Sequence, residues 1–283
     1  MTFSYYGLAL AVSAAVGCAA ALACCRDRQK APALFAALSL ALPLGLLGAR
    51  LLYAAVNAGF FLHDIQSPLA MARIREGGLS LMGALALACL AALPGAKIGG
   101  ARARDTLAAM APGLLVFAAG ARLSEWVIGA GYGPEASFSL PLLTRAVSGS
   151  PRLNTALLMA LCALALVPIA LQRGFSMTAF CYGASQLLLE SLRRDGHMLW
   201  GFVHAEQAAA LAIAFAALLC LSETRGRAWL SACATLLVSA AIVALEFALD
   251  RSNLSDTLLY AVYTLAVGGY MAYGAAIAGK KRR

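Results

Sequence analysis

Charged side chains are scarce in this chain of 283 residues: only 12% are Asp, Glu, Lys or Arg, and only 3 residues are His. Soluble domains carry about 25% charged and about 45–50% apolar residues, whereas 62% of this chain is hydrophobic and its mean hydropathy is +0.80. A water-soluble fold could not cover so much apolar surface. The scarcity of charge therefore excludes an ordinary soluble domain and indicates that lipid is the solvent.

Cysteine pairs and histidine clusters that would bind a metal are also missing. The 8 cysteines all lie in apolar segments, without a C-x-x-C pair and without a histidine at ligand spacing, which is typical of buried packing residues. We therefore expect no metal and no cofactor. The net charge of +9 comes from cations scattered over short loops, with no basic helix and no basic stripe interleaved with aromatic residues. Nucleic acid is thus not an expected partner.

Long apolar runs dominate what remains, and in a bilayer such runs form helices because each helix satisfies its own backbone hydrogen bonds. We predict an all-α fold, a polytopic integral membrane bundle of about nine transmembrane helices, each of roughly 20 residues. The expected spans are residues 5–25, 32–61, 78–95, 106–124, 153–172, 175–192, 200–222, 229–249 and 257–279.

The distribution of positive charge predicts the orientation, because Lys and Arg accumulate in cytoplasmic connectors. Alternate connectors hold most of the cations: Arg26, Arg28, Lys30, Lys97, Arg102, Arg104, Arg173, Arg225, Arg227, Lys280, Lys281, Arg282 and Arg283. The other connectors hold fewer, and these share their loops with acidic residues. We therefore expect the N-terminus outside and the C-terminus inside, with the first apolar run kept as an uncleaved span.

Several charged and polar residues lie inside the apolar spans, where a charge costs at least about 2.5–3.5 kcal/mol at mid-helix and by default marks a functional cavity. Arg50, Tyr53 and Asn57 recur at steps of three and four and so share one helix face. A second such face holds Tyr182, Gln186, Glu190 and Arg193, and further polar residues lie near span ends at Arg122, Glu125, His204, Glu206, Gln207 and Glu246. Arginines beside glutamates suit a phosphate-bearing ligand. The alternative is a set of ion pairs that hold the bundle together.

Two external connectors, residues 63–77 and about 125–152, are the longest, and the second is rich in glycine. Glycine-rich connectors beside intramembrane charge suggest backbone that dips into the outer leaflet, which is allowed where protein or a watered cavity covers it.

The polar stretches resemble, in order and spacing, the motifs of the prolipoprotein diacylglyceryl transferases. Residues 48–53, G-A-R-L-L-Y, look like G-x-R-x-x-Y, and residues 75–84, R-E-G-G-L-S-L-M-G-A, are similar to W-E-G-G-x-S-F-H-G-G. Residues 122–126 with Gly129 and Gly133 look like R-x-G-N-F-x-N-G-E-x-x-G. The second polar face keeps the spacing of Y-x-x-x-R-x-x-x-E-x-x-R, and Gln207 follows where the last family span begins with G-Q. The resemblance covers residues 1–225.

This resemblance implies a diacylglyceryl-transferase-like seven-helix membrane core over residues 1–225, to which residues 226–283 add two helices and a basic cytoplasmic tail. It implies transfer of a diacylglyceryl group from phosphatidylglycerol to a lipobox cysteine thiol during lipoprotein biogenesis. The location would be the bacterial cytoplasmic (inner) membrane, with several passes. The partners would be phosphatidylglycerol, or another anionic phospholipid, and a preprotein that carries a lipobox.

Roles for individual residues follow from the resemblance, because the reaction needs a base for the thiol proton and cations for the departing phosphate. The expected catalytic residues are Glu125, Arg122, Tyr182 and Glu190. The expected lipid-phosphate-binding residues are Arg50, Tyr53, Arg193, Gly78, Ser80, Gly133 and Gln186. Glu76 and His204 are alternative bases near the external surface.

Two departures from the family motifs leave the activity open. Met82 stands where the family has a His, and Gln186 stands where it has an Arg. A thioether cannot accept a thiol proton, and an amide carries no charge for a phosphate. One hypothesis is therefore a transferase with an altered base, and the second is a degenerate relative that binds anionic lipid or lipopeptide without turnover. A third, a transporter, rests on the intramembrane charges alone.

Overall fold

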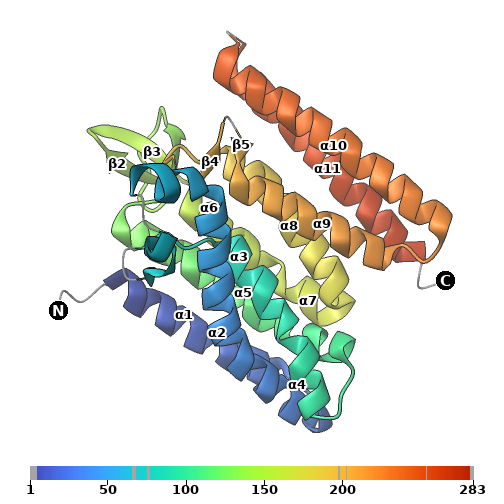
Figure 1. Ribbon diagram of the computed structural model, residues 1–283. Helices are drawn as coiled ribbons and strands as arrows, with labels where there is room; N and C mark the ends of the chain where they lie inside the picture. The colour runs from blue at the N-terminus through green and yellow to red at the C-terminus, as the bar shows by residue number, and fades with distance from the viewer. Residues whose placement is uncertain are drawn as a thin grey trace. The chain divides into compact units, whose positions relative to one another are not determined.

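The computed structural model describes residues 5–65, 68–74, 77–196, 198–201, 203–252 and 254–280, with the backbone alone for Asp64, Pro68, Trp200 and Lys280. Helices make up most of it (Figure 1). The α-helices are α1 (Tyr5–Cys24), α2 (Ala31–Val56), α3 (Leu81–Leu90), α4 (Ala92–Ile98), α5 (Ala103–Ile128), α6 (Thr155–Ala165), α7 (Val167–Arg173), α8 (Phe175–Ser191), α9 (Ala205–Leu221), α10 (Arg225–Arg251) and α11 (Asp256–Lys280). Short helices in the connectors are η1 (Arg28–Lys30), η2 (Phe60–Asp64) and η3 (Pro68–Ala72).

Within the described ranges, 7 helical stretches are long and apolar enough to cross a membrane, namely residues 5–24, 28–56, 81–98, 103–128, 155–173, 225–251 and 256–279. The predicted all-α membrane fold is confirmed. The count of about nine is not confirmed, because spans of roughly 20 residues are needed and α8 and α9 have 17 residues each. In the region predicted to begin a span at residue 200, the chain first pairs β4 (Leu199–Trp200) with β5 (Val203–His204), so α9 begins at Ala205.

The glycine-rich connector forms a small antiparallel sheet, which the sequence analysis did not predict. Its strands are β1 (Tyr132–Glu135), β2 (Thr144–Val147) and β3 (Ser150–Asn154), in the order β1-β3-β2. Arg152 on β3 pairs with Glu135 on β1 at 3.2 Å. Part of the connector thus satisfies its backbone hydrogen bonds in strands, and the predicted dip into the outer leaflet stays a prediction. These strands were missed because they are short and lack regular apolar alternation.

The chain forms two compact units, and the first consists of residues 1–130 and 163–171. Within it α1 packs along α5, and α2 packs against α3 and α4. The helices α2 and α3 approach most closely at Gly48 and Gly83, where a Cβ on either glycine would collide with the backbone carbonyl oxygen of the other. Small residues permit such contacts where lipid supplies no hydrophobic driving force. This crossing brings Ala49 close enough to the start of α3 for its carbonyl oxygen to accept the Ser80 N–H at 3.0 Å.

The second unit consists of residues 131–162 and 172–283. Here α8 packs against α9 and α11, and α10 packs against α9 and α11. The long helices α10 and α11 run side by side (Figure 1). The predicted division at residue 225 stays a prediction, but α10 and α11 belong to the same unit as α8 and α9.

Candidate functional site

Arg50, on α2 in the first unit, holds the loop that precedes α3. Its buried guanidinium donates from Nε to the carbonyl oxygen of Met71 at 2.6 Å and from Nη2 to that of Ala70 at 2.9 Å. Nη1 donates to the carbonyl oxygens of Gly77 and Gly78. Both glycines have positive φ, 81° and 70°, which glycine adopts without steric cost. Four of the five N–H groups of a guanidinium thus bind described backbone, and Arg50 shapes the loop.

Three other predicted lipid-binding residues surround Arg50. The Tyr53 ring lies 5.6 Å from the Arg50 guanidinium, close enough for a cation–π contact. Gly78 lies against the same ring, and a Cβ at Gly78 would collide with it. Ser80 is the N-cap of α3, where its Oγ accepts the N–H of Gly83 at 3.1 Å. The structure therefore brings Arg50, Tyr53, Gly78 and Ser80 together where α2 meets the start of α3.

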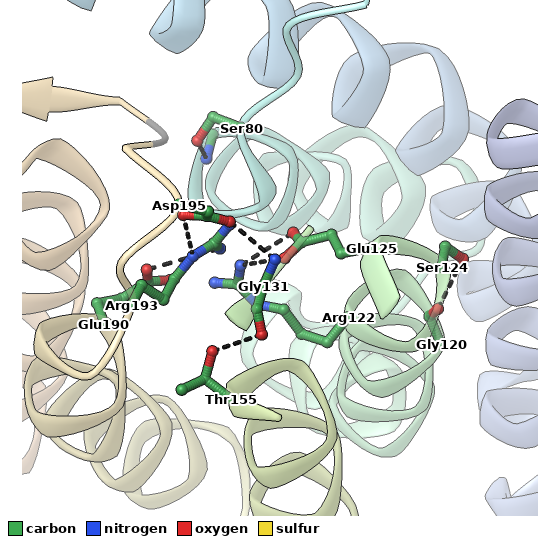
Figure 2. Close-up of polar contacts among 11 residues, drawn as sticks. Ser80, Gly120, Arg122, Ser124, Glu125, Gly131, Thr155, Glu190, Arg193 and Asp195 are labelled. Atoms are coloured by element: carbon green, nitrogen blue, oxygen red, sulfur yellow. Dashed lines mark hydrogen bonds and ion pairs between the residues drawn. The ribbon is translucent and has the colours of Figure 1, made fainter. Parts of the chain in front are cut away.

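Arg122 and Glu125 form an ion pair one turn apart near the end of α5 (Figure 2). Arg122 Nη1 lies 3.0 Å from Glu125 Oε1 and 3.2 Å from Oε2. The Arg122 side chain is only 1% exposed and that of Glu125 is 12% exposed. Loss of one member of a buried pair is costly because the remaining charge stays buried. The two residues therefore act as one preformed unit.

The predicted polar face of α8 is buried, and its last turn carries an ion cluster in the second unit. Tyr182, Gln186 and Glu190 are all buried on this helix. Arg193, just beyond its end, donates from Nε to Asp195 Oδ1 at 3.2 Å and from Nη2 to Oδ2 at 2.6 Å. Arg193 Nη1 lies 3.7 Å from Glu190 Oε2. A bidentate contact of this kind fixes the orientation of the guanidinium.

Asp195 is a member of this cluster that the sequence analysis did not single out. Besides Arg193 it binds the backbone N–H of Gly131, which donates to Oδ2 at 2.8 Å (Figure 2). The carbonyl oxygen of Gly131 accepts the Thr155 hydroxyl at 2.6 Å. Asp195 thus ties the chain before β1 to the end of α8. The sequence could have indicated Asp195 through its position two residues after Arg193. Spacing alone, however, does not predict the contact with Gly131.

Two buried glutamines of the second unit differ in their hydrogen bonds. Gln207 on α9 accepts the N–H of His204 at 3.1 Å, and its Nε2 donates to Glu246 Oε1 at 2.7 Å and to the carbonyl oxygen of Leu187 at 3.1 Å. Gln186 on α8 is 0% exposed, yet neither its Nε2 nor its Oε1 has a hydrogen-bond partner in the described part of the chain. An amide that is buried in this way costs free energy unless a ligand or water satisfies it.

Gly133 and His204, two further residues that the resemblance singled out, lie in the second unit. Gly133 lies in β1 against Thr155, whose Cγ2 would be 2.7 Å from a Cβ at that position. His204 is the N-cap of α9 and forms a capping box with Gln207. Glu76 lies outside the described residues. Among those that are described, no three His, Cys, Asp or Glu side chains gather in a way that could hold a metal ion.

A family profile described as prolipoprotein diacylglyceryl transferase matches residues 1–222. The chain belongs to this family. Its helical membrane architecture is that of the family. No curated protein matches the chain. The profile match ends before Arg225, where α10 begins, so α10 and α11 lie beyond the part of the chain that it matches.

Arg122, Glu190 and Arg193, to which the resemblance assigns catalytic or binding roles, are buried, and Glu125 is partly buried. Met82, which replaces the motif His, lies in the first turn of α3 and is 0% exposed. Glu125 is the motif substitution that adds a carboxylate, and it pairs with Arg122. Residues 182, 186 and 190 of the tyrosine-containing motif all point away from solvent.

Proposed function

We propose that the protein transfers the diacylglyceryl group of phosphatidylglycerol to the thiol of a lipobox cysteine. The thiol sulfur forms a bond to the terminal carbon of the diacylglyceryl group, and the bond from that carbon to the phosphate oxygen breaks. The thiol proton passes to a carboxylate of the protein, and glycerol phosphate leaves. The family match over residues 1–222 supports the transferase activity, whereas the lipid and the acceptor are part of the proposal.

The single observation that carries the proposal is the buried Arg122–Glu125 pair at a family motif position. A guanidinium can bind a departing phosphate through two hydrogen bonds, and a carboxylate within about 3 Å of a thiol can accept its proton. We assign these two roles to Arg122 and Glu125. Because Met82 cannot take a proton, we assign the role of the base to Glu125, with Glu76 and His204 as the alternatives.

The roles proposed for residues of the second unit rest on contacts within that unit alone. Arg193 is proposed to bind phosphate, and Glu190 to hold its guanidinium, to which it lies at 3.7 Å. Tyr182 is proposed to donate a hydrogen bond to the substrate. Gln186 is proposed to bind an uncharged polar group of the lipid with its amide, which has no partner among the described residues. Gly133 keeps the strand β1 close to Thr155.

Arg50 and its neighbours are proposed to bind the lipid in a different manner from the other arginines. One Nη2 hydrogen of Arg50 is not used by the backbone carbonyls described above, and it can donate to one phosphate oxygen. The greater contribution of Arg50 is to fix the loop at Gly78 and Ser80 beside Tyr53. We propose the cytoplasmic membrane of a bacterium as the location, with the N-terminus outside.

A degenerate relative that binds anionic lipid without turnover is the second candidate. The observation that favours it is the pair of substitutions at buried positions, Met82 and Gln186, each 0% exposed. Neither side chain carries charge or accepts a thiol proton as the family residue would. Under this alternative the arginines still bind phosphate, so lipid affinity persists and transfer is absent.

Purified protein, phosphatidylglycerol and a synthetic lipobox peptide test the proposal. We expect release of glycerol phosphate together with a peptide whose mass has increased by one diacylglyceryl group. Glu125→Gln should reduce turnover by at least about 100-fold, and Arg122→Gln by a similar factor. The matched control is Arg152→Gln, which breaks the Arg152–Glu135 pair in the external sheet and should leave turnover within about twofold.

Three results separate the readings of this experiment. Turnover that depends on Glu125 and Arg122 supports the transferase. Binding of phosphatidylglycerol by the wild-type protein without any transfer supports the degenerate relative. Absence of both binding and transfer, in protein that is folded in detergent, overturns both.

A further inference from the structure

The helices beyond the family match, α10 and α11, contact the last turn of α8 through polar atoms. Tyr263 on α11 donates its hydroxyl to the carbonyl oxygen of Leu187 at 2.9 Å. Tyr260, one turn earlier, donates to the carbonyl oxygen of Ser191 at 3.1 Å. The last four carbonyl groups of a helix have no partner within the helix, and in lipid each unsatisfied group is expensive. The Ser191 carbonyl is one of these four groups in α8, so Tyr260 binds a group that lacks a partner within the helix, whereas Leu187 lies one turn earlier and its carbonyl receives an additional bond from Tyr263.

A buried carboxylate on α10 completes this contact. Glu246 is 4% exposed, and its Oε1 accepts from Gln207 Nε2 at 2.7 Å and lies 3.2 Å from the Tyr263 hydroxyl. Gln207 Nε2 also reaches the carbonyl oxygen of Leu187 at 3.1 Å. Glu246, Gln207 and Tyr263 thus join α8, α9, α10 and α11 at one point. We call Glu246, Tyr260 and Tyr263 the α8 latch.

The same turn of α8 carries the charged side chains of the candidate site. Glu190 immediately precedes Ser191, and Arg193 follows two residues later with its bidentate contact to Asp195. The next residue, Arg194, donates its N–H to the carbonyl oxygen of Tyr132 at 2.9 Å, and its Nη2 donates to the Tyr260 hydroxyl at 3.1 Å. The end of α8 is therefore fixed by β1 through one set of bonds and by α11 through another.

We propose that α10 and α11 form a positioning element that fixes the last turn of α8, with Glu246, Tyr260 and Tyr263 as the positioning residues. Two lipid-facing helices need only apolar packing to stay attached to the bundle. A buried glutamate in a span is costly, so Glu246 indicates a role beyond attachment. The polar atoms of the latch lie at the turn where Glu190 and Arg193 need a fixed geometry. The element lies outside residues 1–222, which the family profile matches, whereas the turn that it supports lies within them.

The chain provides matched control residues within the same two helices. Tyr270, also on α11, has its hydroxyl 2.8 Å from the Thr235 hydroxyl on α10, and its ring packs edge-on against Phe180. Tyr273 has its hydroxyl 3.4 Å from that of Ser231 on α10. Replacement of either tyrosine by Phe removes a hydroxyl contact between α10 and α11 but none of the hydrogen bonds from Tyr260 and Tyr263 to α8. A general loosening of α10 and α11 would appear in these controls, whereas loss of positioning would not.

Hydrogen–deuterium exchange of the full chain in detergent tests the latch without any assumption about activity. The double variant Tyr260→Phe, Tyr263→Phe should raise exchange of the backbone amides over residues 190–196 by about fivefold to tenfold, since local opening follows the hydrogen bonds lost. Tyr270→Phe and Tyr273→Phe should leave that segment unchanged. Glu246→Leu should act like the double variant, and Glu246→Gln, which keeps an acceptor oxygen for Gln207 and Tyr263, should restore slow exchange.

The outcomes are distinct from those of the transfer assay. Unchanged exchange over 190–196 in the double variant overturns the latch, and so does equal acceleration in Tyr270→Phe. Equal exchange in Glu246→Leu and Glu246→Gln also overturns it, because it would show that the acceptor oxygen, which Gln keeps and Leu lacks, has no effect. If the wild-type protein shows no transfer but the exchange pattern is as expected, the transferase proposal fails and the latch stands. If transfer occurs, we expect the double variant to lower kcat by about tenfold with little change in the KM for lipid.

Discussion

Replacement of each buried glutamine by leucine is the sharpest test of the polar interior of the second unit. Gln186 and Gln207 are both almost completely buried, and leucine is close to glutamine in volume, so packing changes are small in both variants. The difference between them is hydrogen bonding. Gln207 contacts His204, Glu246 and Leu187 at 2.7–3.1 Å, whereas neither polar atom of Gln186 has a partner among the described residues.

The expected effects have opposite signs. Gln207→Leu removes several hydrogen bonds, each worth about 0.6–1.5 kcal/mol, and leaves the His204 N–H without its side-chain acceptor, so we expect a loss of about 2–3 kcal/mol in the free energy of unfolding. Gln186→Leu removes an amide whose burial without partners costs about 1–3 kcal/mol. Its free energy of unfolding should therefore stay the same or rise by about 1 kcal/mol.

Thermal unfolding in detergent, followed by tryptophan fluorescence with and without phosphatidylglycerol, measures both effects. At roughly 2–4 °C per kcal/mol for a protein of this size class, Gln207→Leu should unfold several degrees below the wild type, and Gln186→Leu at or above it. Added lipid should raise the midpoint of Gln207→Leu by more than that of Gln186→Leu, because Gln186→Leu loses the proposed amide contact while the arginines still bind lipid. Equal lowering of both midpoints without lipid would refute the reasoning.

Further predictions concern the first unit and the ion cluster. Arg50→Lys should increase protease cleavage within residues 70–78 by about tenfold, because an ammonium cannot reproduce the fork of bonds to the loop; unchanged cleavage would argue against a loop-fixing role. Arg122→Ala should abolish binding of labelled anionic lipid, and native affinity in this variant would contradict the phosphate assignment. Gly48→Leu should lower the free energy of unfolding by more than about 2 kcal/mol. Gly59→Ala should leave it unchanged, because a Cβ at Gly59 meets nothing within 4 Å. Equal unfolding free energies of the two variants, measured by denaturation, would contradict the close contact at Gly48. Asp195→Ala should cost about 3 kcal/mol by the same measurement because it leaves a buried guanidinium without its bidentate partner, and a loss below about 1 kcal/mol would be inconsistent with that contact.

Much of the candidate site followed from the sequence because its signals are local. Residues at steps of three and four share a helix face, so Arg122 and Glu125 were correctly grouped, and Glu190 was correctly grouped with Arg193. The partner of Arg50 was not accessible in this way. Its guanidinium binds backbone carbonyls about 20 residues further along the chain. Every residue has a backbone carbonyl, so the sequence does not show which of them a guanidinium will bind.

By itself, the sequence determined the solvent, the fold class and the family. The scarcity of charge and the long apolar runs are properties of composition and of neighbouring residues along the chain. In lipid such runs form helices irrespective of what they later contact. The tertiary structure alone decided that Asp195 binds both Arg193 and Gly131, that the glycine-rich connector pairs into strands, and that Tyr260 and Tyr263 bind the end of α8. Arg193 and Asp195 are only two residues apart, but the bonds of Asp195 to Gly131 and of the two tyrosines to α8 join residues more than 60 positions apart, and their geometry exists only once the helices have packed.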